Sequence, residues 1–252
     1  MIILKIAQGI ESIELTSNLM SRVSIVNPTV IWDHETVVLV DTGLPGLLPD
    51  IHEAFSKAGI PFEKLNRVIL THQDIDHIGC LQDIRGELGD KVEILSHTNE
   101  KPYIQGDIPL IKSNSAFAKQ AAASMPENLR DKFLSIFNNP PKANVDKTVA
   151  DGEVLPFCGG IRVIYTPGHT PGHICLYHIP SKTLIAGDEL NIEDDGKLHG
   201  PRPRAAADIE TANRSLAKLL DYDVSTVVCY HGGVSSDNVN ARIAELVKEL
   251  AQ

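Results

Sequence analysis

The sequence predicts an α+β fold built on mixed β-sheets. Apolar runs of strand length alternate with segments in which apolar residues recur every three or four positions, as they do in amphipathic helices. Several neighbouring strands are separated by only a short turn, which favours antiparallel hairpins beside parallel pairs. The chain has 252 residues, 42% of them hydrophobic, which fits one large domain or two tightly packed halves. We expect residues 1–252 to form a single domain.

The first forty residues are expected to form strands. A mixed segment at 10–15 precedes apolar runs at 23–26 and 30–32. Residues 36–40 are a continuous β-branched and apolar run, typical of a strand that is buried on both faces. Apolar residues at 47–58 then share one face of a helix, which Gly59 is suited to end.

A strand is also expected at 67–70, followed by a helix from Ile78 to about Leu88 and a strand at 92–95. The second half of the chain repeats the alternation. Its expected strands lie at 161–165, 175–177, 183–186 and 226–230, and its expected helices lie after Asp208, a suitable N-cap, and at 239–250.

Residues 99–147 differ from the rest because five prolines interrupt them. A helix-prone, alanine-rich stretch at 115–123 and an apolar helical stripe that ends near Phe137 lie between the prolines. We interpret 99–147 as a helical insertion packed over the functional site, although a pair of scaffold helices without a role in binding fits equally well. The apolar residues expected to contact a substrate there are Tyr103, Phe117, Met125, Phe133 and Phe137.

Five apolar runs end in the same way, with a histidine or aspartate at or just past the strand end. These residues are Asp41, His72, His169, Asp188 and His231. Loops that leave one edge of a sheet are where a rigid scaffold presents functional groups. Packing alone does not readily explain five such ends.

The densest motif is His72-Gln73-Asp74-Ile75-Asp76-His77, with four potential metal ligands in six positions. His72 and Asp74 are two residues apart, so they point the same way in extended backbone, whereas the adjacent Asp76 and His77 should diverge. A polar turn with capping aspartates is the alternative. The position directly after a buried strand favours a metal site.

With these motifs in this order, the chain from Asp41 to His231 resembles the metallo-β-lactamase superfamily. It is closest in style to glyoxalase II-like and acyl-homoserine-lactonase-like hydrolases, and the segment 166–173, TPGHTPGH, is a close match. The resemblance implies a four-layer αβ/βα sandwich of two mixed β-sheets flanked by helices. It also implies a site for two divalent metal ions at the sheet edges.

The resemblance further implies a role for each matched residue. His72 and His169 match ligands of the first metal, Asp76, His77 and His231 match ligands of the second, and Asp188 matches the carboxylate that bridges both. Asp76 would also orient the attacking water and act as the catalytic proton carrier. Asp41 matches an aspartate that braces the motif loop, and His173 is expected to be a supporting histidine behind the ligands.

Asp74 departs from the family pattern, which usually has a histidine at this position. A carboxylate still ligates metals, and the related flavodiiron proteins have a glutamate there, so we expect Asp74 to bind the first metal. Zinc is the first choice for both ions, with manganese or iron as alternatives because carboxylates suit harder metals. With Asp74, Asp76, Asp188 and one hydroxide, two divalent ions form a formally neutral core.

The implied function is hydrolysis of an ester, lactone, thioester or amide bond by metal-activated water. An iron-dependent redox enzyme, similar to flavodiiron proteins or persulfide dioxygenases, is the alternative on the same ligands. A binding protein with a purely structural metal is a third possibility, but a structural zinc needs only four protein ligands. The lactonase tyrosine that follows the bridging aspartate is missing after Asp188.

Composition excludes several other classes. The net charge of −10 argues against nucleic-acid binding, which needs a basic surface. The sequence shows no signal peptide, no stretch of membrane-spanning length and no C-x-x-C pair. We therefore expect a cytoplasmic enzyme with a small-molecule substrate and no membrane partner, while the oligomeric state stays open.

Overall fold

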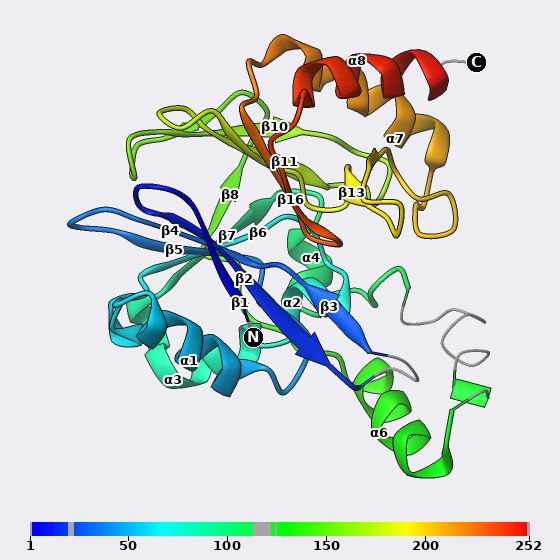
Figure 1. Ribbon diagram of the computed structural model, residues 1–252. Coiled ribbons are helices and arrows are strands. Elements are labelled where there is room, and N and C mark those ends of the chain that lie inside the picture. Colours follow the sequence, from blue (N-terminus) through cyan, green and yellow to red (C-terminus); the bar gives the residue numbers. More distant parts are fainter. Residues whose placement is uncertain (1, 20–22, 113–121, 124, 251–252) are drawn as a thin grey trace.

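The computed structural model describes residues 2–19, 23–112, 122–123 and 125–250 (Figure 1). Two β-sheets pack face to face, and helices cover the outer face of each. Helices α1 (Leu48–Lys57) and α3 (Leu81–Leu88) cover the first sheet, and α7 (Ile209–Leu216) and α8 (Val239–Leu250) cover the second. This is the four-layer αβ/βα arrangement expected from the sequence.

The first sheet is mixed. Its strands run in the order β1-β2-β4-β5-β6-β7-β8, with β3 paired to β2. The pairs from β5 to β8 are parallel and the others are antiparallel. The strands are β1 (Ile2–Ala7), β2 (Ile10–Ser17), β3 (Ser24–Val26), β4 (Thr29–Trp32), β5 (Val37–Val40), β6 (Arg67–Leu70), β7 (Glu93–His97) and β8 (Lys147–Val149).

The second sheet has the order β16-β15-β12-β11-β10-β9, in which only β12 and β15 are parallel. Its strands are β9 (Val154–Leu155), β10 (Ile161–Tyr165), β11 (Ile174–His178), β12 (Thr183–Ile185), β15 (Thr226–Cys229) and β16 (Gly233–Ser235). A separate hairpin joins β13 (Asn191–Ile192) and β14 (Leu198–His199). Both sheets are therefore mixed, as expected.

Among the described residues, the remaining helical elements are short except for one. They are η1 (Phe62–Lys64), α2 (Ile75–Ile78), η2 (Gly89–Lys91), α4 (Lys101–Ile104), α6 (Glu127–Asn138) and η3 (Ala217–Asp221). The helix expected from Ile78 is interrupted, because α2 ends there and α3 begins at Leu81. A Cβ on Gly79 would lie 2.3 Å from the Gly43 carbonyl oxygen, so a loop of the first sheet crosses the chain at this break. None of the helices in the described ranges is long and apolar enough to span a membrane.

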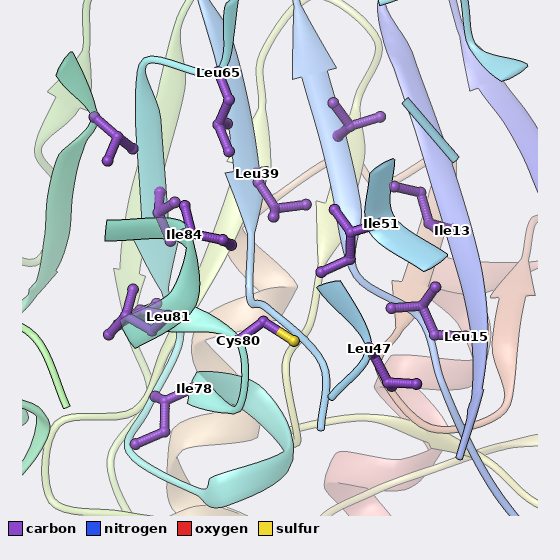
Figure 2. Packing of buried hydrophobic residues seen from close by; sticks show 14 of the residues in the cluster. Ile13, Leu15, Leu39, Leu47, Ile51, Leu65, Ile78, Cys80, Leu81 and Ile84 are labelled. Atoms are coloured by element: carbon purple, nitrogen blue, oxygen red, sulfur yellow. The ribbon is translucent and has the colours of Figure 1, made fainter. Parts of the chain in front are cut away.

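Alternation along the strands distributes apolar side chains between separate cores. In β6, Val68 and Leu70 face the α1–α3 layer, whereas Ile69 faces the second sheet. Figure 2 shows the first of these cores, in which strand residues such as Leu39 pack against Ile51 of α1 and Ile84 of α3. Each fully buried side chain of this size contributes about 1.5–3 kcal/mol. This packing fixes the sheet edges from which the polar loops emerge.

The segment 99–147 contains α4 and α6, and α6 extends away from the two sheets (Figure 1). Of the helix expected at 115–123, residues 115–121 lie outside the described residues. Met125 and Phe133 pack against each other and against Ala122, with Phe137 beside them. The segment thus has a small apolar core of its own, and whether it acts as an insertion over the site stays a prediction.

Candidate metal centre

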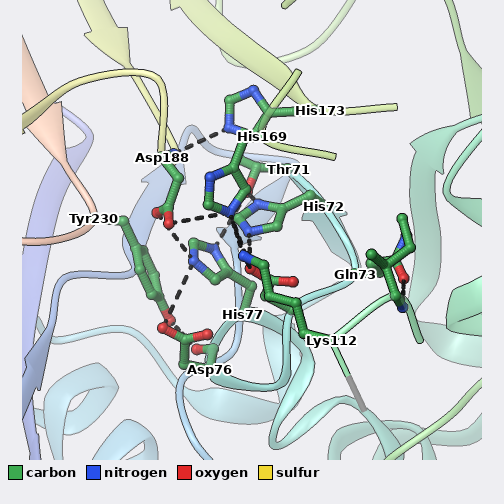
Figure 3. A network of polar contacts seen from close by, with 12 residues as sticks. Thr71, His72, Gln73, Asp76, His77, Lys112, His169, His173, Asp188 and Tyr230 are labelled. Carbon is green, nitrogen blue, oxygen red and sulfur yellow. Dashed lines mark hydrogen bonds and ion pairs between the residues drawn. The ribbon is translucent and has the colours of Figure 1, made fainter. Parts of the chain in front are cut away.

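The polar strand ends meet at one edge of the two packed sheets (Figure 3). Strands β5 and β6 are parallel neighbours in the first sheet, so Asp41 and His72 leave the same edge. Strands β12 and β15 are parallel neighbours in the second sheet, which places Asp188 and His231 at its corresponding edge. His169 comes from the loop between β10 and β11. The ends of parallel strands in the two sheets therefore bring side chains from both halves of the chain to the same site.

Seven candidate ligands form two groups, in each of which the ligand atoms lie within 4.8 Å of one another. The first group is His72, Asp74, His169 and Asp188, and the second is Asp76, His77 and His231. Asp188 also reaches the second group, because its Oδ1 lies 3.2 Å from His77 Nε2 while its Oδ2 lies 3.3 Å from His169 Nε2. The Asp188 carboxylate therefore contacts both ligand groups, and its role as a bridge between two ions stays a prediction.

Asp76 and His77 do not diverge, contrary to the expectation from an extended loop. Both lie in α2, where successive side chains are separated by about 100° rather than 180°. Asp76 Oδ2 lies 3.9 Å from His77 Nε2 and 3.3 Å from His231 Nε2. The helical turn therefore allows two consecutive residues to join one ligand group.

Asp41 braces the motif loop from beneath. Its Oδ1 accepts the backbone N–H of Thr71 at 2.8 Å, and its Oδ2 accepts the Thr71 hydroxyl at 2.8 Å and His77 Nδ1–H at 2.9 Å. Because Nδ1 of His77 is the donor here, Nε2 is the atom that faces the ligand group. Asp41 therefore contacts both ends of the motif loop, and its supporting role stays a prediction.

His173 supports Asp188 rather than joining a ligand group. Its Nε2 accepts the backbone N–H of Asp188 at 3.0 Å, and its Nδ1 lies 2.9 Å from the Thr166 hydroxyl. Burial lowers the pKa of His173 well below its usual value, which keeps the imidazole neutral and able to accept. Gly187 is required beside it, because a Cβ there would lie 2.6 Å from His173 Nε2.

Glu100 is a buried carboxylate that the sequence did not indicate. It accepts the backbone and side-chain N–H groups of Gln73 at 2.9 and 3.0 Å, and the backbone N–H of Gly172 at 2.6 Å. Gln73 Oε1 in turn accepts the N–H of Ile111 at 2.8 Å. Glu100 therefore joins the His72 loop to the His169 loop, and Gln73 joins both to the 99–147 segment.

Lys112 and Tyr230 also lie at the site without having been predicted. The Lys112 ammonium contacts Asp74 Oδ2 and lies 3.0 Å from His169 Nε2. The Tyr230 ring stacks on His77 with 3.7 Å between ring centroids, and its hydroxyl donates to the Asp76 carbonyl. Tyr230 directly precedes the predicted ligand His231, and this adjacency could have indicated that Tyr230 lies at the site. The sequence around Lys112 contains no comparable indication.

The ligand groups concentrate charge. Burial disfavours the imidazolium of His77, but Asp41, Asp188 and Asp76 outweigh it and raise the pKa of His77 well above its usual value. For His231, burial is likewise opposed by Asp188 and Asp76, which raise its pKa to about 9. The carboxylates therefore favour positive charge in the ligand group that contains His77 and His231.

The donor set fits divalent metal ions. Three buried ligand atoms, His72 Nε2, His77 Nε2 and Asp188 Oδ1, form no hydrogen bond of suitable geometry among the described residues, although the last two lie 3.2 Å from each other. An unsatisfied buried polar atom is costly, and all three belong to the two ligand groups. Imidazole nitrogens mixed with carboxylate oxygens suit zinc, manganese and iron.

A cavity of about 400 Å³ opens onto these groups. Its polar wall includes Asp74, Asp76, Asp188 and His231, and its remaining lining is Ile75, Leu110, Ile111, Lys112, Phe137, Arg202, Arg204, Ala205, Ala206 and Ala207. Of the five residues expected to contact substrate, Phe137 lies on this wall. Tyr103 lines a neighbouring hollow, Met125 and Phe133 pack in their own small cluster, and Phe117 lies outside the described residues. Substrate contact by these residues stays a prediction.

Comparisons with known proteins agree with this geometry. Residues 21–231 match the family model described as the metallo-beta-lactamase superfamily. A probable metallo-hydrolase of Bacillus subtilis (strain 168) is 32% identical over 232 residues, which cover 85% of this chain and 82% of the relative. A hydroxyacylglutathione hydrolase of Rhizobium etli is 41% identical over 193 residues, covering 76% of this chain and 57% of the relative.

Solved structures show the same fold. A metallo-beta-lactamase family protein from Thermus thermophilus superposes with a TM-score of 0.70 at 24% identity, covering 97% of this chain and 80% of that protein. The mixed sheets flanked by helices in the two proteins correspond, which confirms the fold class expected from the sequence.

Proposed function

This chain belongs to the metallo-beta-lactamase superfamily, and we propose that it binds two divalent metal ions and hydrolyses an ester, lactone, thioester or amide bond of a small molecule. The observation that supports this most directly is the position of Asp188 between two groups of candidate ligands. We propose His72, Asp74 and His169 as ligands of one ion, Asp76, His77 and His231 as ligands of the other, and Asp188 as the bridge. We further propose that the chain forms one domain.

Two bound divalent ions would supply an acidified water and polarise the substrate carbonyl. Residues of the chain would orient the water, transfer its proton and hold the ligands in position. We propose that Asp76, whose side chain is 26% exposed and lines the cavity, orients the attacking water and passes its proton to the leaving group. Asp41 and His173 hold His77 and Asp188 in position through the hydrogen bonds described above.

Lys112 alters the charge balance at Asp74. Asp74 in place of histidine would leave two metal ions and their ligands formally neutral. The Lys112 ammonium contacts that carboxylate and restores one positive charge beside the site. We therefore propose that the site retains the electrophilic character hydrolysis needs, with zinc as the first choice and manganese or iron as alternatives.

The relatives support a carbonyl substrate. The Rhizobium etli relative is named a hydroxyacylglutathione hydrolase, and an acylglutathione is a thioester, one of the bond types proposed here. A second candidate function, iron-dependent redox chemistry, is favoured by one observation, the carboxylate of Asp74 in the first group, because carboxylates suit iron better than a third imidazole does.

The test begins with elemental analysis of protein purified without added metal. The protein is then assayed on a panel of activated esters, lactones, thioesters and amides with zinc, manganese or iron restored one at a time. We expect metal-dependent cleavage that chelation abolishes and that Asp188→Ala and His169→Ala lose. Asp195→Ala, which changes an exposed carboxylate paired with His199, is the control and should remain active. Absence of hydrolysis with every metal, together with iron-dependent oxygen uptake on a thiol or persulfide, would establish the redox function instead.

A further inference from the structure

Two arginines line the cavity, and their positive charge is opposite in sign to the net charge of the chain. Arg202 and Arg204 line the same cavity as Asp76, Asp188 and His231. The chain as a whole carries a net charge of −10, and the rest of this cavity is lined mainly by aspartates of the ligand groups and by apolar side chains. Two guanidinium groups beside a candidate catalytic centre therefore require a specific explanation.

The loop that carries the arginines is fixed to the candidate ligands. Ala207 N–H donates to the His169 carbonyl at 3.0 Å, and Asp208 N–H donates to the Gly168 carbonyl at 2.8 Å. Within the loop, the N–H groups of Ala205 and Ala206 both donate to the Arg202 carbonyl, at 3.0 and 3.1 Å. The arginine backbone is thus held at a set position relative to His169, which is what a recognition site needs.

Neither guanidinium group forms a close ion pair with a carboxylate among the described residues. Arg204 forms no ion pair with a carboxylate in the part of the chain that the structure describes. Arg202 Nε lies 3.7 Å from Glu193 Oε1, and both side chains are more than one-third exposed, so this pair is weak. The third cation on the wall, Lys112, is balanced by Asp74. Arg202 and Arg204 are therefore the cations on this wall that no carboxylate among the described residues contacts closely.

We propose that Arg202 and Arg204 bind an anionic group, a carboxylate or phosphate, on the substrate of this site. Guanidinium groups match the planar oxygen pairs of such anions and hold them by charge-assisted hydrogen bonds. The apolar part of the same molecule would lie against Ile111 and Phe137. The identification as a substrate site rests on the proposed hydrolase function, but the binding of the anion does not depend on turnover.

Binding is therefore measured directly by calorimetry on the metal-reconstituted protein. The probes are 4-phenylbutyrate, 3-phenylpropyl phosphate and the uncharged 4-phenylbutanamide, which share an apolar portion and differ in charge. We expect at least one anion to bind on the order of tenfold more tightly than the amide, because a charge-assisted contact to Arg is among the stronger polar interactions. Whichever anion binds more tightly identifies the chemical group.

The variants Arg202→Gln and Arg204→Gln should each weaken anion binding about fivefold, and the double variant should remove the advantage over the amide. Arg214→Gln, which changes an exposed arginine of α7 paired with Glu210, is the matched control and should bind like the parent protein. Equal binding of the three probes, or an advantage that survives in the double variant, would overturn the proposal. Loss of hydrolysis on every substrate with retained, arginine-dependent anion binding would count against the hydrolase function alone.

Discussion

Asp41 Oδ2 and His77 Nδ1 lie 2.9 Å apart, although 36 residues separate them in the chain. Asp41 adopts a left-handed backbone conformation, with φ of 61°, at the point where β5 ends. That conformation turns its carboxylate toward Thr71 and His77, so one residue fixes both the start and the end of the motif loop. Asparagine also tolerates left-handed backbone, which allows the carboxylate to be removed without a backbone penalty.

Asp41→Asn should lower metal affinity about 10–100-fold, the usual cost of losing a partner behind a ligating histidine. The amide cannot accept from Thr71 and His77 at once with the same oxygen pair, so the ring of His77 is no longer fixed. Equilibrium dialysis with zinc measures the change. The control is Asp33→Asn, because Asp33 accepts the backbone N–H groups of Glu35 and Thr36 in a turn remote from the site. Unchanged affinity in Asp41→Asn would remove Asp41 from any supporting role.

The contact between Asp74 and Lys112 leads to a second prediction. Asp74→Ala should lose metal at the first ligand group and most activity, because it removes a ligand and leaves the Lys112 ammonium beside a cation. Asp74→His should retain metal and shift preference from manganese toward zinc. Lys112→Met should bind metal at least as tightly as the parent, since the ammonium contacts the same oxygen that the metal would use. Competition dialysis with both metals compares the three variants, and a metal-loaded structure with Asp74 turned away from the ion would refute its assignment.

Four of the seven candidate ligands, His72, His169, Asp188 and His231, could be proposed from the sequence because each follows an apolar run that forms a strand in a mixed sheet. Strand ends are a local property of sequence, so His72 or Asp188 can be found without the fold. Glu100 and Arg204 could not be found in this way, because each acquires its neighbours only when loops from distant parts of the chain meet. The helical turn at Asp76 and His77 was missed because α2 spans only Ile75–Ile78, and a single turn is too short to show helical periodicity.

Glu100 provides a third prediction. Glu100→Ala leaves the buried N–H groups of Gln73 and Gly172 without an acceptor, and it should destabilise the protein by about 3 kcal/mol. Glu100→Gln keeps one acceptor oxygen and should recover part of that loss. Urea unfolding measures both, with the exposed Glu63→Ala expected within about 0.5 kcal/mol of the parent. Stability of Glu100→Ala equal to that of Glu63→Ala would show that these hydrogen bonds do not hold the loops.

Phe137 carries the fourth prediction, because it is the predicted substrate residue that lies on the cavity wall. Phe137→Ala should raise KM for a long-chain acyl substrate roughly tenfold and affect an acetyl substrate much less, since only the longer chain would contact the ring. Steady-state kinetics on the matched pair give the comparison. Phe157→Ala, which changes a ring packed on Arg67, is the control for losing an aromatic side chain elsewhere. Equal changes for long and short substrates would mean that Phe137 does not contact the acyl chain.

The pH dependence of stability provides the last prediction, through His178. Its ring is buried against the Cys158 carbonyl, to which Nε2 donates at 2.7 Å, and Ser181 lies 2.7 Å from Nδ1. Burial lowers the pKa of His178 from 6.5, so the unfolded chain binds a proton more readily than the folded protein does. The stability that the neutral ring contributes is complete above pH 6.5 and is lost as the pH falls through its lowered pKa.

His178→Gln should therefore reduce the decrease in unfolding free energy between about pH 7.5 and about pH 5. Urea unfolding across this range gives the difference between parent and variant, in which the titration of all other histidines cancels. His34→Gln is the control, because the His34 side chain is 85% exposed and should leave the pH dependence unchanged. If the curves of parent and His178→Gln stay parallel over the range, His178 is not a source of acid sensitivity.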